Sequence, residues 1–347
     1  MNARVSLANS DRSFSVLPDQ SVLDAALGAG INLPHSCKGG NCGSCRARLI
    51  AGKITYPNGP PLGLSDAQVA AGFVLLCHAR AQGDLLLESI EVKTADEAIS
   101  KRLPGRIERT ERLAHDVMAV FLRLPAAESF AFDPGQYLDI LLAGGNRRSF
   151  SIASPPHDAR LLELHVRHVP GGKLTDGLFA RDPQGTLWSI EGPLGQFVYR
   201  HTAAPMLMVG GGTGLAPLKS MLRHVIENRL QRDITLYWGV RSERDLYWHE
   251  ELVALAAGTP NFRYHAVLSD PGPNWRGKRG WVHEVAMREI PSLTPYDIYA
   301  SGPPAMIARI RADFCRAGAS ADRIFVDSFD YAFDAPERQD SMADTKS

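Results

Sequence analysis

The chain is organised around the stretch Cys37-Lys38-Gly39-Gly40-Asn41-Cys42-Gly43-Ser44-Cys45, the cluster loop, which is followed at a distance by Cys77. Three cysteines spaced by four and then two residues, completed by a distant fourth, form the ligand pattern of a [2Fe–2S] cluster. Such a core needs four thiolates, and glycines allow the backbone to fold closely over it. The alternatives are a structural zinc site and unrelated buried cysteines, but zinc sites usually contain two close cysteine pairs. The pattern therefore predicts as cluster ligands Cys37, Cys42, Cys45 and Cys77.

Length and composition describe a globular protein with several domains. The 347 residues exceed one average domain, and contents of 44% hydrophobic and 22% charged residues are ordinary. A net charge of zero predicts no binding of nucleic acid. No apolar run approaches the length of a membrane span and no signal peptide is seen, so we expect no membrane association and a cytoplasmic protein. Cys315 is the one cysteine left over, which argues against a disulfide framework. We expect it on a helix, with its side chain in the apolar core of the protein.

The cluster-binding domain is predicted to span residues 1–93. Short strands surround one helix, for which Ser21 and Asp24 form a capping box. This α+β mixture resembles the β-grasp ferredoxins, and Cys77 follows an apolar strand as the fourth ligand of that family does. The polar residues 94–102 show no strand pattern and predict a linker.

Residues 103–200 contain many short strands separated by turns, which predicts a small antiparallel β-barrel. Within it, Arg148-Ser149-Phe150-Ser151 resembles the Arg-x-Tyr/Phe-Ser flavin motif of the ferredoxin–NADP reductase superfamily. A guanidinium can pair with a flavin phosphate, an aromatic ring can pack on the flavin, and the Ser151 hydroxyl can act where hydride is accepted. The motif alone would also fit a surface strand. Its neighbours Pro134-Gly135-Gln136-Tyr137 and Gly192-Pro193-Leu194-Gly195-Gln196-Phe197 stand in the order of that superfamily.

A second flavin element is predicted at Gly171-Gly172-Lys173-Leu174-Thr175. Backbone N–H groups that open a helix suit a pyrophosphate. The resemblance implies flavin contacts from Gly172, Lys173, Leu174 and Thr175. It also implies FAD rather than FMN, because most relatives with an N-terminal ferredoxin use FAD.

From residue 201 to residue 334 strands alternate with helices, which predicts a doubly wound parallel sheet. The sequence Gly210-Gly211-Gly212-Thr213-Gly214, the glycine loop, follows a buried strand and opens a helix. It departs from G-x-G-x-x-G, because Leu215 takes the place of the third glycine. The loop resembles instead the nicotinamide-pyrophosphate loop of the superfamily, and the alternative is a glycine-rich turn in an unrelated α/β domain. The polar residues 335–347 predict a disordered tail.

Two later motifs bear on hydride transfer. Ser301-Gly302-Pro303-Pro304 resembles the Cys-Gly-Pro-Pro element near the nicotinamide, with serine in place of cysteine. A hydroxyl at Ser301 can still line the hydride path. Asp327-Ser328-Phe329 resembles the terminal acidic-x-aromatic element, in which Phe329 would shield the flavin and move aside for nicotinamide. The alternative for Phe329 is packing in the C-terminal core.

The choice between NADH and NADPH depends on the segment after the second strand of this sheet. Arg241, Ser242 and Arg244 could hold a 2′-phosphate, whereas Glu243 would repel it. The order of the modules favours NADH by resemblance.

As far as about Phe329, the chain resembles the ferredoxin-first members of the ferredoxin–NADP reductase superfamily. The resemblance implies an enzyme that passes electrons from NADH through FAD and a [2Fe–2S] cluster to a partner protein. Such partners are CDP-6-deoxy-hexulose dehydrases or components of mono- and dioxygenases. The cluster loop and residues 245–252 resemble those of the dehydrase reductases, although nothing in the chain itself separates the two kinds of partner. A non-catalytic redox sensor is the alternative from another class.

Overall fold

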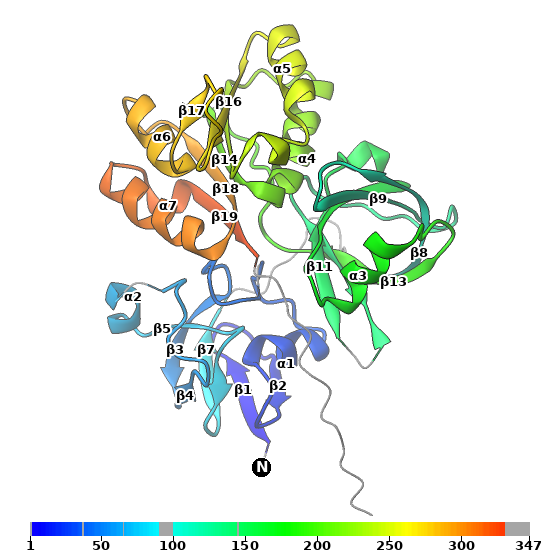
Figure 1. Ribbon diagram of the computed structural model, residues 1–347. Helices are drawn as coiled ribbons and strands as arrows, with labels where there is room; N and C mark the ends of the chain where they lie inside the picture. Colours follow the sequence, from blue (N-terminus) through cyan, green and yellow to red (C-terminus); the bar gives the residue numbers. More distant parts are fainter. Residues whose placement is uncertain (1, 37, 65, 90–99, 144–145, 330–347) are drawn as a thin grey trace, which may run out of the picture.

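The computed structural model describes residues 2–36, 38–64, 66–89, 100–143 and 146–329. These residues form three large sheets, one for each predicted domain (Figure 1). The N-terminal sheet lies at the bottom of Figure 1, the barrel at the right and the parallel sheet at the upper left. Cys37, most of the predicted linker and the predicted tail lie outside the described residues. The domain boundaries at residues 93, 103, 200 and 334 stay predictions.

The N-terminal domain has a mixed five-stranded sheet of order β2-β1-β7-β3-β5. Strand β1 pairs antiparallel with β2 and parallel with β7, so the two ends of the domain meet in the sheet. Half of the predicted capping box is seen at the start of α1: the Asp24 N–H donates to Ser21 Oγ over 3.0 Å, while the Asp24 carboxylate accepts from the Ser21 hydroxyl over 2.6 Å. The elements are β1 (Ala3–Leu7), β2 (Ser13–Val16), α1 (Val22–Gly28), β3 (Arg46–Ala51), β4 (Ile54–Thr55), α2 (Asp66–Ala70), β5 (Phe73–Leu75), β6 (Arg80–Ala81) and β7 (Leu85–Glu88).

The second domain is an antiparallel sheet of order β11-β10-β13-β8-β9-β12. A bridge between Ile152 and Leu164, next to the two edge strands, closes this sheet into a barrel. Strand β8 begins at Lys101, two residues inside the predicted linker. The elements are β8 (Lys101–Arg112), β9 (Val117–Arg123), β10 (Tyr137–Leu141), β11 (Arg147–Ser151), η2 (Pro156–Asp158), β12 (Leu161–Arg167), α3 (Lys173–Ala180) and β13 (Leu187–Leu194).

The third domain is a wholly parallel sheet of order β17-β16-β15-β14-β18-β19. Helices α4 and α5 cover one face and α6 and α7 the other, so β14 and β15 read as continuous apolar runs. The strand order reverses at β14, the point where such sheets bind ligands. The elements are β14 (Met206–Gly211), η3 (Gly212–Gly214), α4 (Leu215–Glu227), β15 (Ile234–Val240), η4 (Glu243–Asp245), α5 (His249–Gly258), β16 (Phe262–Leu268), β17 (Lys278–Arg279), α6 (Val282–Glu289), β18 (Asp297–Gly302), α7 (Pro304–Arg316), η5 (Ala321–Arg323) and β19 (Ile324–Ser328).

The predicted fold class is confirmed in all three parts, whereas the placement of Cys315 in a core is wrong. Cys315 is exposed on α7. The buried face of that helix carries Ile307, Ile310 and Phe314. Cys315 follows Phe314 directly and is therefore rotated by about 100° away from the sheet. None of the described helices is both long enough and apolar enough to cross a membrane.

Candidate functional site

The three domains meet around one cavity of about 320 Å³. Its walls come from the start of the cluster loop and the residue before it, from β10, β11 and β12 of the barrel, from the start of α3, from η3 and the start of α4, and from the end of β19. Segments that lie up to 291 residues apart in the sequence are thus brought together. The lining residues that carry most of the argument below are Ser36, Lys38, Ser151, Arg167, Thr213 and Asp327.

The cavity gathers most of the residues predicted to bind flavin. All four residues of the motif on β11 line it, and so do Gly172, Leu174 and Thr175. Lys173 is the exception, because it lines a second cavity on another side of α3. Gly172 is required by packing, since a Cβ there would lie 2.8 Å from Thr175 Oγ1 and 2.9 Å from a backbone oxygen of Val169.

Three guanidinium groups and one ammonium group make this cavity suitable for an anionic ligand. Asp139 on β10, with a side chain only 1% exposed, forms ion pairs with two of these cationic groups. Its carboxylate lies 3.4 Å from Lys38 Nζ and 3.4 Å from Arg147 Nη1, and it accepts a hydrogen bond of 2.6 Å from Ser149 Oγ. Cations beside a half-buried Phe150 fit a ligand with phosphates and an aromatic ring, which is the chemistry of FAD. The lining cations are Lys38, Arg147, Arg148 and Arg167.

Asp327 connects the cluster-binding domain to the barrel. Its buried carboxylate accepts hydrogen bonds from Ser36 Oγ at 2.9 Å and from Ser151 Oγ at 3.4 Å. Burial raises the pKa of Asp327 to about 7, although the two hydroxyl groups oppose this shift. Ser36 precedes the first cluster cysteine, so the cluster loop is tied to the predicted flavin hydroxyl. Sequence reasoning missed this role, because no local pattern links such distant residues.

The described part of the cluster loop has the tight, left-handed backbone turns expected of a loop that folds over a cluster. Lys38, Gly40 and Gly43 have φ values of 51°, 77° and 73°, in the left-handed region that favours glycine. Cys42, Cys45 and Cys77 are buried free thiols, and Cys37 lies outside the described residues. The Ser44 N–H donates to Cys42 Sγ over 3.4 Å, a contact that stabilises a thiolate. The three thiols therefore fit cluster ligands.

The glycine loop lies at the carboxyl end of β14 and packs against the end of β18. A Cβ at Gly214 would lie 2.1 Å from Ser301 O, and one at Gly302 would lie 3.2 Å from Gly211 N. The loop carbonyl of Gly212 accepts a hydrogen bond of 2.9 Å from Trp238 Nε1. A 13-residue helix, α4, begins directly after the loop, and helix N-termini favour phosphate groups. The loop therefore fits a dinucleotide.

The predicted nicotinamide residues do not all reach the cavity. Thr213 and Phe329 line it, and the Phe329 N–H donates to Gly302 O over 3.4 Å. Ser301 is 0% exposed, and its Oγ has no hydrogen-bond partner. The predicted contact of Ser301 with the hydride path stays a prediction. The other residues that do not line the cavity are Gly210, Gly211, Gly212, Gly214, Gly302 and Pro303.

Three protein-family models match consecutive parts of the chain. A 2Fe-2S iron-sulfur cluster binding domain matches residues 5–82, an oxidoreductase FAD-binding domain matches residues 104–199, and an oxidoreductase NAD-binding domain matches residues 208–312. The chain belongs to the ferredoxin-first branch of the ferredoxin–NADP reductase superfamily. It is an NADH-dependent electron-transfer reductase that uses FAD and a [2Fe–2S] cluster, as predicted.

Relatives of this reductase match over almost their whole length. The CDP-6-deoxy-L-threo-D-glycero-4-hexulose-3-dehydrase reductase of Yersinia pestis is 34% identical over 95% of this chain and 99% of its own. Reductase component 2 of the terephthalate 1,2-dioxygenase of Comamonas sp. is 35% identical over 95% of this chain and 98% of its own. The crystal structure of the Amycolatopsis cytochrome P450 reductase GcoB superposes with a TM-score of 0.75, at 34% identity, over 94% of this chain and 99% of the other.

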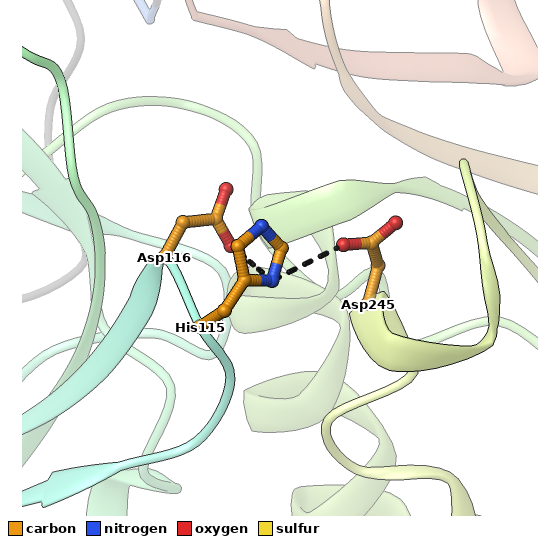
Figure 2. Close-up of side chains that lie close together, drawn as sticks. All are labelled: His115, Asp116 and Asp245. Carbon is orange, nitrogen blue, oxygen red and sulfur yellow. Dashed lines mark ion pairs between the residues drawn. The ribbon is translucent and has the colours of Figure 1, made fainter.

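A polar bridge joins the barrel of the reductase to its nucleotide domain (Figure 2). His115 Nδ1 lies 3.6 Å from Asp245 Oδ1 and 3.8 Å from Asp116 Oδ1. The second oxygens of the carboxylates are held by protein groups: Asp116 Oδ2 lies 3.2 Å from Arg167 Nε, and Asp245 Oδ2 accepts from Ser242 N over 2.8 Å. These contacts link the turn before β9 to η4. The sequence did not predict a role for Arg167 or Asp116, because their partners lie on other elements.

Proposed function

We propose that this reductase carries electrons from NADH to a partner protein that is a deoxysugar dehydrase. Support comes from the relative of Yersinia pestis, which is named as a reductase of such a dehydrase and matches over nearly its full length. The observation that carries the electron route within the chain is a cavity lined by described residues of all three domains. When bound there, FAD converts a two-electron hydride into single electrons.

Each wall of the cavity has a proposed task. Arg148 and the backbone at Gly172 and Thr175 hold the flavin phosphates, while Ser151 and Asp327 place a hydroxyl and a carboxyl group at the reacting end of the flavin. Thr213 at the cavity and the other glycine-loop residues beside it hold the nicotinamide dinucleotide, and Phe329 covers the flavin until the nicotinamide enters. These proposed roles are supported by the residue types and by the places of these residues around the cavity.

The cluster loop is held next to the flavin cavity without help from another protein. Lys38 contacts Asp139 of the barrel, and Ser36 donates to Asp327. Gly43 lies against α7, since a Cβ at Gly43 would be 2.5 Å from Arg311 Nη1. These contacts favour transfer of electrons from the flavin to the cluster within one chain, before they leave for the partner.

A second candidate is a reductase component of a mono- or dioxygenase. It is favoured by the relative of Comamonas sp., which is named as the reductase of a dioxygenase and is as similar as the dehydrase reductase. Both candidates share every residue of the internal electron route. The difference between them lies in the protein that accepts the electrons.

The test is the anaerobic visible spectrum of the purified protein before and after addition of NADH, with NADPH in a parallel sample. Bleaching of both flavin and cluster bands by NADH is the expected result. Titration of the reduced protein with a purified sugar dehydrase and with a purified oxygenase component then identifies the acceptor by reoxidation of the cluster. If neither nucleotide changes either band, the proposal fails and a redox sensor becomes the better hypothesis.

A further inference from the structure

Tyr247, in the segment after η4, contacts the barrel through a partly buried hydrogen bond. Its hydroxyl lies 3.0 Å from His165 Nδ1 on β12, and the two rings meet edge to face with centroids 5.3 Å apart. His165 is 5% exposed and lines the flavin cavity. Together with the bridge between Asp245 and His115, this contact ties residues 245–247 to the barrel at two points.

Glu163 on β12 is the centre of this buried network. One carboxylate oxygen lies 2.9 Å from His165 Nε2, and the two oxygens accept hydrogen bonds of 2.6 and 2.7 Å from Lys219 Nζ on α4. His165 Nε2 therefore donates to Glu163, while Nδ1 accepts from the Tyr247 hydroxyl, which is the arrangement of a neutral imidazole. Every polar atom of the network has a partner. Burial lowers the pKa of His165, in agreement with its neutral form.

The same network reaches the glycine loop from two directions. Lys219 lies on α4, which begins directly after the loop. The Tyr247 ring packs edge to face on Trp238, with centroids 5.0 Å apart, and Trp238 donates to the carbonyl of Gly212. A path of contacts therefore runs from Glu163 to the loop carbonyl, and a second path runs to the helix that the loop opens.

We propose that Glu163 is a positioning residue, which sets the glycine loop against the flavin-binding strands through Lys219 and through the pair of His165 and Tyr247. The inference rests on the proposed assignment of the loop to the nicotinamide dinucleotide. A buried charge pair is rigid only while all of its partners are present, and loss of one partner leaves a buried charge uncompensated. Hydride transfer needs the reacting atoms about 3–3.5 Å apart, and a misplacement of about 1 Å costs about 100-fold in rate.

Two variants and one control test this inference in the full-length holoprotein. Glu163→Gln removes the charge at constant shape, and Tyr247→Phe removes one hydrogen bond while the ring packing on Trp238 remains. Glu108→Gln is the matched control, because Glu108 pairs with Arg123 on the exposed surface of the same barrel. FAD and iron content are measured first and used to normalise the kinetics.

For Glu163→Gln we expect the rate of flavin reduction at saturating NADH to fall about 10- to 100-fold, with a smaller change in KM. The charge-transfer absorbance between nicotinamide and flavin should weaken, and hydrogen exchange of residues 210–222 should become faster. Tyr247→Phe should change the same quantities in the same direction by a few fold. Glu108→Gln should match the wild type.

The inference would be overturned if Tyr247→Phe kept the wild-type reduction rate, charge-transfer absorbance and hydrogen exchange. The same result in Glu163→Gln, if that variant folds, would also overturn it. Lower thermal stability with unchanged kinetics per bound FAD would overturn it as well, because the network would then be merely structural. If NADH does not reduce the wild-type protein, the proposed function itself fails. Exchange at residues 210–222 then still decides whether Glu163 holds the loop.

Discussion

Replacement of Gly214 by alanine is the sharpest test of the glycine loop. The new Cβ would lie 2.1 Å from the backbone oxygen of Ser301, almost 1 Å closer than real Cβ contacts allow. Ser301 is fully buried and paired with parallel strands on both sides, so its backbone cannot move away from the new methyl group. The φ of Gly214 is −59°, which alanine adopts readily, so the effect is steric rather than conformational. The loop must therefore move away from β18.

Overpacking of this kind costs about 1–3 kcal/mol, which corresponds to about a 5- to 150-fold loss when it acts on nucleotide binding and positioning. We expect kcat/KM for flavin reduction by NADH to fall within this range, while FAD content and cluster absorbance stay at the wild-type level. The assay is anaerobic stopped-flow reduction of the bound flavin. Gly258→Ala is the matched control, because a Cβ at Gly258 meets open space.

A Gly214→Ala protein with wild-type kcat/KM for NADH would refute the reasoning, since the packed loop would then not be the dinucleotide site. Loss of FAD together with loss of NADH reactivity would also contradict it, because the clash lies in the nucleotide domain alone. The Gly258→Ala control separates both outcomes from a general effect of adding a methyl group to that domain.

Four further outcomes are expected. Arg148→Ala should weaken FAD retention about 10- to 100-fold, seen as a lower ratio of FAD to protein after gel filtration, and full retention would exclude the phosphate contact. Cys42→Ser should abolish cluster absorbance while NADH still bleaches the flavin; loss of both would contradict separate sites. For Glu163, burial alone would raise the pKa, but the hydrogen bond from His165 and the charge of Lys219 lower it to about 2. Its contribution to stability is thus present above about pH 4.5 and lost as the pH falls, so the unfolding temperature of Glu163→Gln should fall less than that of the wild type below that pH. An equal fall would disprove this linkage. Glu243→Gln should raise kcat/KM for NADPH relative to NADH a few fold, because the Glu243 carboxylate, in η4 after β15, repels a 2′-phosphate; an unchanged ratio would show that other residues discriminate between the two nucleotides.

Local features of the fold were predictable because their physical causes are local. The Ser21 cap of α1 and the parallel strand β14 follow from hydrogen bonding between near neighbours and from a continuous apolar run. The period of α7 was also visible, but it did not reveal which face would be buried. Cys315 was consequently placed in the core, although it lies one residue beyond the buried stripe.

The partners of the site residues were not predictable from the sequence. Asp139 lies within an ordinary strand pattern and Asp327 within a recognisable motif, yet neither pattern indicates the groups from other domains that these carboxylates contact at the cavity. Glu163 and Lys219 are separated by 56 residues and pair only because the barrel packs against α4. Such contacts produce no periodic pattern in a single sequence, because each of the two residues fits its own strand or helix equally well whether or not the other is present.

The sequence by itself determined the cofactors, the order of the domains and the class of reaction. Each cofactor is recognised by a short motif, such as the cysteine spacing of the cluster loop or the glycine loop after β14, and short motifs are written in consecutive residues. Only the tertiary structure decided that parts of these sites meet at one cavity, that Ser301 is buried against Gly214, and that Glu163 links the barrel to the helix after the glycine loop. These properties depend on how the domains pack, which is set by shape and buried polar pairing across their surfaces rather than by any one stretch of chain.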